Sequence, residues 1–306
     1  MMIDAHSHML QGNYPTSNLP RSVDDLTNVD WPGLMSGLDQ LGLESVVTLS
    51  QEMTRIRDQW LGSNELAVDL QKRTEGRFIG IAGFEPLTRM DQFNEAGFER
   101  VRELVKSGKV RGLLITPPYG HFQLNDRRAY PFYQMAVENK VPIYVHQGAM
   151  FGPTGNAPQY QNRIWNVDQV VVDFPDLRLN IEHMAWPWTE ELLAIMAHGP
   201  NVYTDVTMLS LRPHMLAWNL TMAGDYQLLD RVLWGTDYVG KDTGHSLIRA
   251  PGGVLKQATY LETVGEELDF YQNKLNSILK RCGWPTLSAK QIDGLLGENV
   301  RRFLEL

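Results

Sequence analysis

The chain has 306 residues and a formal net charge of -8, with 43% hydrophobic and 21% charged residues, a composition ordinary for a globular protein. The negative charge, with no run rich in Lys and Arg, argues against nucleic acid or an anionic membrane as a partner. A single cysteine, Cys282, excludes an intrachain disulfide and is typical of a reducing compartment.

The N-terminal residues contain neither the basic stretch nor the apolar stretch of a signal peptide. No segment approaches the roughly 18 consecutive apolar residues that a membrane span requires. We therefore expect a soluble, cytoplasmic protein without a membrane partner.

Short apolar runs alternate with longer amphipathic segments along most of the chain. The expected strands, in chain order, are residues 2–6, 45–49, 78–84, 112–116, 142–146, 178–183, 201–205 and 232–236. Their nearly continuous hydrophobicity indicates strands buried on both faces. The expected helices between them include residues 32–41, 64–74, 93–107, 130–139, 167–174 and 190–198.

Repeated strand–helix units favour an open doubly wound sheet or a closed barrel. No Gly-x-Gly-x-x-Gly follows an expected strand, which weakens the case for a nucleotide-binding open sheet. The sequence therefore predicts a distorted (β/α)8 TIM barrel, an α/β fold, as a single domain over residues 1–306. Residues 11–30 are expected to form a long loop after the first strand, and about 250–306 a helical extension packed on the barrel.

Several of the expected strands end on a histidine or an aspartate. His6 and His8 end the first strand, His146 ends the fifth, His183 the sixth, and Asp237 follows the eighth. The carboxyl ends of all strands of a barrel meet at one face, so we expect these side chains to converge there. His6 and His8 are separated by one residue, and alternate residues of a strand point to the same side, as chelation of one cation requires.

His6, His8, His146 and Asp237 together offer imidazole and carboxylate ligands with room for a water, the composition of a catalytic metal site. Imidazole ligands suit zinc, iron, nickel or copper better than magnesium or calcium. Each residue also has an ordinary alternative: a strand-end histidine is commonly a hydrogen-bonded barrel residue, and Asp237 could cap a following helix. The conjunction of these groups at several strand ends favours the metal site.

Residues in the loops after the strands are candidates for substrate binding. Arg163 and Arg212 could clamp a substrate carboxylate through two hydrogen bonds. His121 follows the fourth strand and could reach the pocket. Trp186 and Trp188 either wall that pocket or pack their loop onto the barrel rim.

These residues, in this order, resemble the amidohydrolase superfamily, and more narrowly its amidohydrolase-related branch. That branch includes aminocarboxymuconate semialdehyde decarboxylase, resorcylate decarboxylase and several lactone hydrolases. The similarity covers nearly the whole chain, through residues 3–8, 110–113, 117–119, 130–133, 142–146, 181–183, 187–188, 201–205, 232–238 and 297–303.

The resemblance implies one divalent metal ion, zinc in most members and manganese in some, held by His6, His8, His146 and Asp237. It implies that His183 either acts in catalysis or supports a ligand. Members with two metal ions carry a lysine at the end of the fourth strand. Residues 112–116 contain no lysine, which indicates a site for one ion.

The sequence departs from the family pattern at two places in the expected substrate-facing loops. Met184 and Ala185 replace the usual Gly-Gly after the sixth-strand histidine, and Val239 replaces a common proline after the eighth strand. Both departures weaken any transfer of a substrate from the family to this chain.

We expect hydrolysis of an ester, lactone or amide-like bond in a small organic acid by a metal-activated water. Asp237 would take the proton of that water and pass it to the leaving group, while His183 would polarise the carbonyl or stabilise the oxyanion. The alternative on the same site is a non-oxidative decarboxylase of an aromatic or unsaturated carboxylic acid. A third interpretation is a catalytically inactive, metabolite-binding barrel, against which the intact ligand set argues. Since relatives are commonly dimers, a homodimer is a further expectation from the family.

Overall fold

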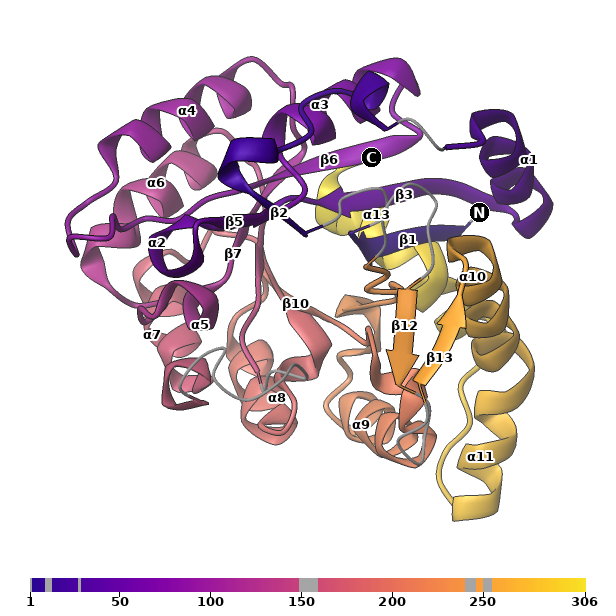
Figure 1. Ribbon diagram of the computed structural model, residues 1–306. Coiled ribbons are helices and arrows are strands. Elements are labelled where there is room, and N and C mark those ends of the chain that lie inside the picture. The colour runs from indigo at the N-terminus through magenta and orange to yellow at the C-terminus, as the bar shows by residue number, and fades with distance from the viewer. Residues whose placement is uncertain (1, 9–12, 27–28, 149–158, 240–245, 250–254) are drawn as a thin grey trace.

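The computed structural model describes residues 2–8, 13–26, 29–148, 159–239, 246–249 and 255–306. Eight parallel strands form one sheet in chain order, and helices surround it (Figure 1). The strands are β1 (Met2–Ser7), β3 (Leu43–Leu49), β6 (Phe78–Gly83), β7 (Gly112–Ile115), β8 (Ile143–Val145), β9 (Leu179–Ile181), β10 (Val202–Asp205) and β11 (Val232–Leu233). Each corresponds to an expected strand, so the prediction of a TIM barrel is confirmed.

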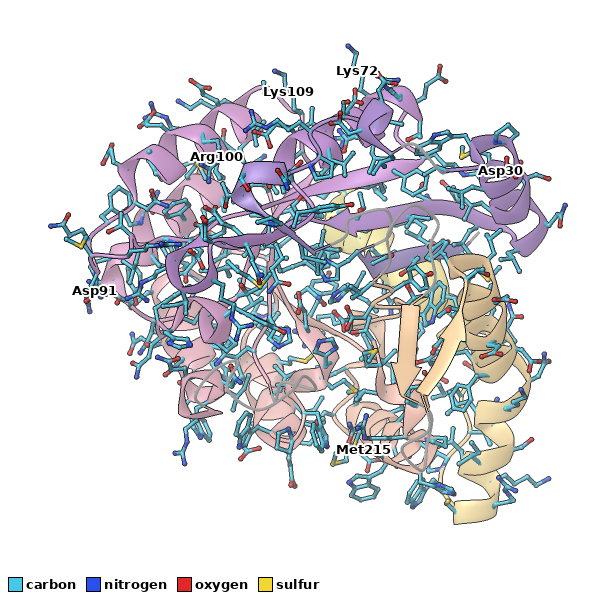
Figure 2. All side chains as sticks on the ribbon, viewed as in Figure 1. Asp30, Lys72, Asp91, Arg100, Lys109 and Met215 are labelled. Carbon is cyan, nitrogen blue, oxygen red and sulfur yellow. The ribbon has the colours of Figure 1, made fainter. Side chains whose placement is uncertain are left out.

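The helices outside the barrel also follow the expected pattern. They are α1 (Trp31–Leu41), α3 (Asn64–Arg73), α4 (Glu95–Lys106), α6 (Tyr130–Glu138), α7 (Trp165–Asp173), α8 (Thr189–His198) and α9 (Pro213–Asp225). Their apolar faces pack on the strands, whereas the charged side chains of Lys72 on α3 and of Lys109, which follows α4, extend away from the protein (Figure 2). None of the helices in the described part of the chain combines the length and apolarity needed to cross a membrane.

The barrel interior is plugged at the amino ends of its strands by the last helix, α13 (Asn299–Leu304). The ring of Phe303 packs edge-on against Tyr144 of β8 at 5.3 Å and at a tilt against Tyr203 of β10 at 5.1 Å. These side chains belong to an apolar cluster that fills the barrel from within. The carboxyl end of the barrel is left as the face where polar side chains can meet.

β1 and the segment after β11 are held together at the seam where the barrel closes. The N–H of Ala5 donates to the carbonyl of Trp234 at 3.0 Å, and the N–H of Asp237 donates to the carbonyl of His6 at 2.8 Å. Gly235 permits this approach, because a Cβ there would lie 2.7 Å from the backbone nitrogen of His6. β11, the eighth strand, spans only Val232–Leu233 and is shorter than the expected residues 232–236.

The first loop contains structure that the sequence did not predict. β2 (Asn13–Pro15) pairs antiparallel with β5 (Gln59–Leu61), which pairs with β4 (Gln51–Met53). The 3-10 turns η1 (Thr16–Asn18) and η2 (Val23–Asp25) follow β2. The expected plain loop is therefore wrong for these residues, while residues 11, 12, 27 and 28 lie outside the described part. Strands this short show no periodicity, so only their partners define them.

The C-terminal extension also differs from the expected run of helices. Its first part is a pair of antiparallel strands, β12 (Ser246–Arg249) and β13 (Leu255–Ala258). Helices begin only afterwards, because Thr259 and Glu262 form a capping box at the start of the first one. They are α10 (Tyr260–Asp269), η8 (Phe270–Lys274), α11 (Leu275–Cys282), α12 (Ala289–Asp293), η9 (Gly294–Glu298) and α13.

Candidate metal centre

His6 and His8 lie at the carboxyl end of β1, and both side chains are buried. His6 Nδ1 is 3.1 Å from Asp205 Oδ2, and His8 Nδ1 is 2.8 Å from the carbonyl oxygen of Leu49. A carbonyl can only accept a hydrogen bond, so neutral His8 carries its proton on Nδ1 and its lone pair on Nε2. The carboxylate of Asp205 favours the same arrangement in His6. Both Nε2 atoms are thus left to face a common partner.

Asp237 is the group that both Nε2 atoms face. Its Oδ1 atom is 3.3 Å from His6 Nε2 and 3.6 Å from His8 Nε2. The strand end before Asp237 is anchored by Asp4, which accepts hydrogen bonds from the backbone N–H of Thr236 at 2.9 Å and from its hydroxyl at 2.7 Å. The carboxylate therefore meets the imidazoles because two strand ends, remote in sequence, are bonded to each other.

This group of ligand atoms requires a positive charge at its centre. Burial lowers the pKa of His6, but the nearby carboxylates, Glu182 and Asp205 foremost, raise it well above its usual range. Burial lowers the pKa of His8 to about 4. Burial raises the pKa of Asp237, but the charge and hydrogen bond of His6 outweigh it and bring the pKa to about 2. A proton on His6 partly meets the requirement, and a divalent ion would satisfy all the ligand atoms, so these residues fit a metal.

A second group adjoins the first. His146 follows β8, and its Nδ1 atom is 2.8 Å from Glu182 Oε2. His146 Nε2 is buried and has no hydrogen-bond partner among the described residues. The second group consists of His146, Glu182 and His183, whose ligand atoms lie within 4.8 Å of one another. The ligand atoms of the first group, His6, His8 and Asp237, meet the same limit. His183 Nε2 and Asp237 Oδ2, 3.9 Å apart, join the two groups.

His183 is held in one orientation by a chain of hydrogen bonds. Its Nδ1 atom is 2.6 Å from the hydroxyl oxygen of Thr207, which is 2.5 Å from Asp205 Oδ1. Because a carboxylate only accepts, the Thr207 hydroxyl donates to Asp205 and accepts from Nδ1–H of His183. Burial lowers the pKa of His183. The neutral ring therefore turns the lone pair of Nε2 toward Asp237.

The backbone around His183 departs from an ordinary strand end. The expected sixth strand continues to residue 183, but β9 ends at Ile181 and the next residues form η5 (Glu182–Ala185). His183, Met184 and Ala185 have φ angles of 56, 50 and 49 degrees, all in the left-handed region. A Gly-Gly pair adopts this region without cost, whereas other residues pay of order 1 kcal/mol each. Met184 and Ala185, which stand at the positions of that pair, adopt the left-handed region without glycine's freedom.

Of the predicted ligands, the structure brings His6, His8 and Asp237 into one group and places His146 in the adjoining one. The binding of a metal by these four residues remains a prediction. Asp237 was alternatively expected to cap a helix. Its carboxylate instead faces the imidazoles of His6 and His8.

Glu182 and Asp205, which orient His146 and His6, were not among the predicted site residues. Asp205 is the last residue of the seventh strand, a position like that of Asp237 after the eighth. The rule that polar residues at strand ends meet at one face would therefore have identified Asp205. Glu182 stands directly before His183. Tyr119 was also missed as a site residue; its ring packs edge-on against His146 at 5.3 Å.

The predicted substrate-binding residues occupy different positions. The Arg212 guanidinium lies over the Trp186 ring at 5.7 Å, so the loops after β9 and β10 meet there. Trp188 is half-buried and packs against the core. Arg163 is exposed, while its backbone carbonyl accepts a hydrogen bond from Gln147 at 2.9 Å.

His121 caps the short helix α5 (Pro117–Gly120) with a φ of 53 degrees, and it is half-buried. Its carbonyl oxygen accepts a hydrogen bond from Arg55 at 3.0 Å. The substrate roles of His121 and of the arginine and tryptophan candidates remain predictions.

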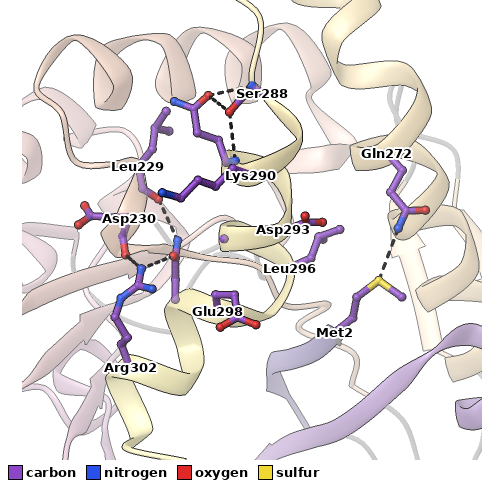
Figure 3. Close-up of a pocket in the computed structure, with 13 residues that line it drawn as sticks. Met2, Leu229, Asp230, Gln272, Ser288, Lys290, Asp293, Leu296, Glu298 and Arg302 are labelled. Atoms are coloured by element: carbon purple, nitrogen blue, oxygen red, sulfur yellow. Dashed lines mark hydrogen bonds between the residues drawn. The ribbon is translucent and has the colours of Figure 1, made fainter.

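A separate cavity of about 960 Å³ lies at the opposite end of the barrel (Figure 3). Met2, at the start of β1, lines it together with Lys290, Glu298 and Arg302 of the C-terminal helices. It contains none of the histidines described above, and charges of both signs line it. The metal centre is therefore defined by its ligand atoms rather than by this cavity.

The family model described as Amidohydrolase matches residues 3–306 of the chain. The chain belongs to the amidohydrolase family. This confirms the resemblance inferred from the sequence. No curated protein sequence matches this amidohydrolase at a significant level.

Solved structures show the same fold. An uncharacterized TIM-barrel protein from Bordetella bronchiseptica is 20% identical, with 99% of this chain and 98% of that chain covered and a TM-score of 0.65. A probable 2-pyrone-4,6-dicarboxylic acid hydrolase from Acinetobacter baumannii, with citric acid bound, is 13% identical over 100% of this chain and 99% of that chain, with a TM-score of 0.62.

A third similar structure is a 5-carboxyvanillate decarboxylase from Novosphingobium aromaticivorans, with bound manganese and a substituted nitrobenzoic acid. It is 12% identical to this amidohydrolase, and the match covers 90% of this chain and 80% of the decarboxylase chain, with a TM-score of 0.57. The solved structures similar to this chain thus include a probable hydrolase and a decarboxylase, and the decarboxylase contains bound manganese.

Proposed function

We propose that this amidohydrolase is a metal-dependent hydrolase that cleaves an ester, lactone or amide-like bond in a small organic acid. The observation that carries the proposal is the convergence of three ligand atoms: Asp237 Oδ1 lies 3.3 Å from His6 Nε2 and 3.6 Å from His8 Nε2. His146 would complete the ligand set through its buried Nε2 atom.

A bound divalent ion supplies Lewis acidity, which polarises a carbonyl and lowers the pKa of a water from about 15.7 toward roughly 7. Zinc is the ion we propose first, because imidazole ligands suit it, and manganese is the alternative. Asp205 and Glu182 hold the histidines in the orientation that metal binding requires.

The remaining chemistry belongs to Asp237 and His183. Asp237 Oδ2 faces His183 Nε2 at 3.9 Å and is the oxygen placed to accept the proton of the attacking water. The hydrogen bond to Thr207 occupies Nδ1–H of His183, so Nε2 would accept a hydrogen bond from the same water and orient it. This differs from the oxyanion role expected from the sequence, which needs a proton on Nε2.

The experiment is product analysis with the metal-loaded enzyme. Purified protein with measured zinc or manganese is incubated with lactones and aryl esters of small organic acids and, separately, with hydroxylated benzoic acids. Ring-opened or cleaved acids formed with uptake of water support the hydrolase. Release of carbon dioxide without water uptake instead establishes the decarboxylase. A protein that binds neither zinc nor manganese contradicts both and leaves a metabolite-binding barrel.

A further inference from the structure

Asp237 has a backbone conformation that its neighbours must hold. Its φ angle is 50 degrees, in the left-handed region that residues other than glycine rarely adopt. The backbone N–H of Asp237 donates to the carbonyl of His6, and the carbonyl of Tyr238, the next residue, accepts from the N–H of His8 at 2.8 Å. The position of this predicted metal ligand therefore depends on how firmly the residues on either side of it are fixed.

The carboxylate of Asp4 fixes the residue before Asp237. It accepts hydrogen bonds from the backbone N–H and the hydroxyl of Thr236, and a longer one from the backbone N–H of His6 at 3.3 Å. The Asp4 side chain is fully buried, and a buried carboxylate is costly unless hydrogen-bond donors surround it. Each donor therefore helps to keep Asp4, and with it Thr236, in place.

Tyr260, the first residue of α10, supplies a donor from outside the barrel. Its hydroxyl donates to Asp4 Oδ2 at 2.8 Å, which places α10 next to β1 (Figure 1). The ring of Tyr260 is buried and packs edge-on against that of Tyr238 at 5.3 Å. One side chain therefore contacts both neighbours of Asp237, Tyr238 directly and Thr236 through Asp4.

We propose that Tyr260 is a positioning residue of the metal centre, an inference that rests on the proposed function. It acts through Asp4: the hydroxyl holds the carboxylate, the carboxylate holds Thr236, and Thr236 fixes the backbone of Asp237. Groups behind a metal ligand set how tightly the ion is bound, because they keep the ligand in the orientation that coordination requires. The C-terminal extension thus contributes to metal binding without supplying a ligand.

The test is Tyr260→Phe, which removes the hydroxyl and keeps the ring that packs on Tyr238. We expect the zinc affinity, measured by competition with a chromogenic chelator, to fall by about 10-fold, the lower end of the loss typical of an orienting partner. The visible absorption spectrum of the cobalt-loaded protein, which reports the geometry of the ligands, should also change. A general loss of stability would alter neither the zinc affinity of the folded protein nor this spectrum.

Tyr133→Phe is the matched control. Tyr133 of α6 is also fully buried, and its hydroxyl donates to the carbonyl of Leu124, in the segment before that helix, at 2.7 Å. The variant loses the same kind of hydrogen bond and should bind zinc as the wild type does. An equal loss of zinc affinity in the two variants, or no loss in Tyr260→Phe, overturns the positioning role.

A double-mutant cycle tests the route through Asp4. Asp4→Asn removes the charge that the Tyr260 hydroxyl contacts and should weaken zinc binding by about 10- to 100-fold. Since the hydroxyl acts through this carboxylate, adding Tyr260→Phe to Asp4→Asn should weaken zinc binding by no more than about 2-fold further. Additive losses in the double variant overturn the route through Asp4.

Turnover, measured on the same preparations, separates this inference from the proposed function. A wild type that hydrolyses its substrate, with normal zinc affinity in Tyr260→Phe, removes only the positioning role. Weaker zinc binding in Tyr260→Phe, with a wild type that cleaves no ester, lactone or amide, removes only the hydrolase. A wild type that binds no zinc overturns both.

Discussion

The Nδ1 atom of His6 lies 3.1 Å from the Oδ2 atom of Asp205, and both side chains are shielded from water. The other oxygen of Asp205 accepts a hydrogen bond from the backbone N–H of His183 at 2.9 Å. One carboxylate therefore orients a predicted ligand on β1 and a predicted catalytic residue after β9.

Asp205→Asn should weaken zinc binding by about 10- to 100-fold, because an amide neither carries the charge nor fixes the His6 tautomer as the carboxylate does. Zinc affinity is measured by competition with a chromogenic chelator. Asp168→Asn, which alters an exposed pair with His198 at 2.9 Å, is the control and should bind zinc normally. Equal zinc affinity in both variants would show that Asp205 does not support the ligand.

His6→Ala combined with His8→Ala should abolish turnover and reduce zinc affinity by more than about 100-fold, beyond the loss typical of an orienting partner. Elemental analysis after dialysis gives the metal content, and circular dichroism reports the fold. His198→Ala, at the exposed end of α8, should change neither. Full turnover in the double variant would refute the proposed site.

His183→Asn should retain zinc and lower kcat by about 100-fold, because the attacking water would lose the group that orients it for proton transfer to Asp237. Zinc should be retained because the Nδ1 atom of His183 bonds to Thr207, while its Nε2 atom lies 3.9 Å from the predicted ligand Asp237. Zinc content and steady-state kinetics are measured on the same preparation. Loss of zinc together with activity would instead make His183 a metal ligand.

Gly235→Ala should destabilise the protein by about 1–3 kcal/mol and weaken zinc binding, since an added methyl would push β1 away from the strand end that carries Asp237. Urea unfolding and zinc titration measure the two effects. Gly224→Ala in α9 is the control, because its Cβ would meet its nearest atom only at 3.5 Å. Unchanged stability in Gly235→Ala would mean that the seam is not tightly packed.

Glu85 gives a prediction about pH. Burial, with the charge of Glu52, raises its pKa from 4.5 to about 8. The folded state therefore holds this proton more tightly than the unfolded state. The resulting stability is complete below about pH 4.5 and is lost progressively as the pH rises to about 8, by up to about 1.4 kcal/mol per pH unit.

Glu85→Gln should remove this slope, so that the variant gains stability relative to wild type as the pH rises from 5 to 8. Urea unfolding at several pH values measures the difference between the two proteins. The same pH dependence in both would show that Glu85 is ionised in the folded state.

The sequence by itself determined the barrel and the face on which its chemistry lies. Strands buried on both faces need continuous apolar runs, and these are recognisable because each run is local and separated from the next by an amphipathic helix. Since the carboxyl ends of such strands converge, strand-end position alone predicts one shared face for five side chains, those of His6, His8, His146, His183 and Asp237.

Tertiary structure alone decided how those residues are held and what stands beside them. The tautomers of His8 and His183 depend on a carbonyl and a hydroxyl from other strands. Such contacts join residues far apart in the chain, and their geometry is fixed by packing and hydrogen bonding between elements, which no local pattern records.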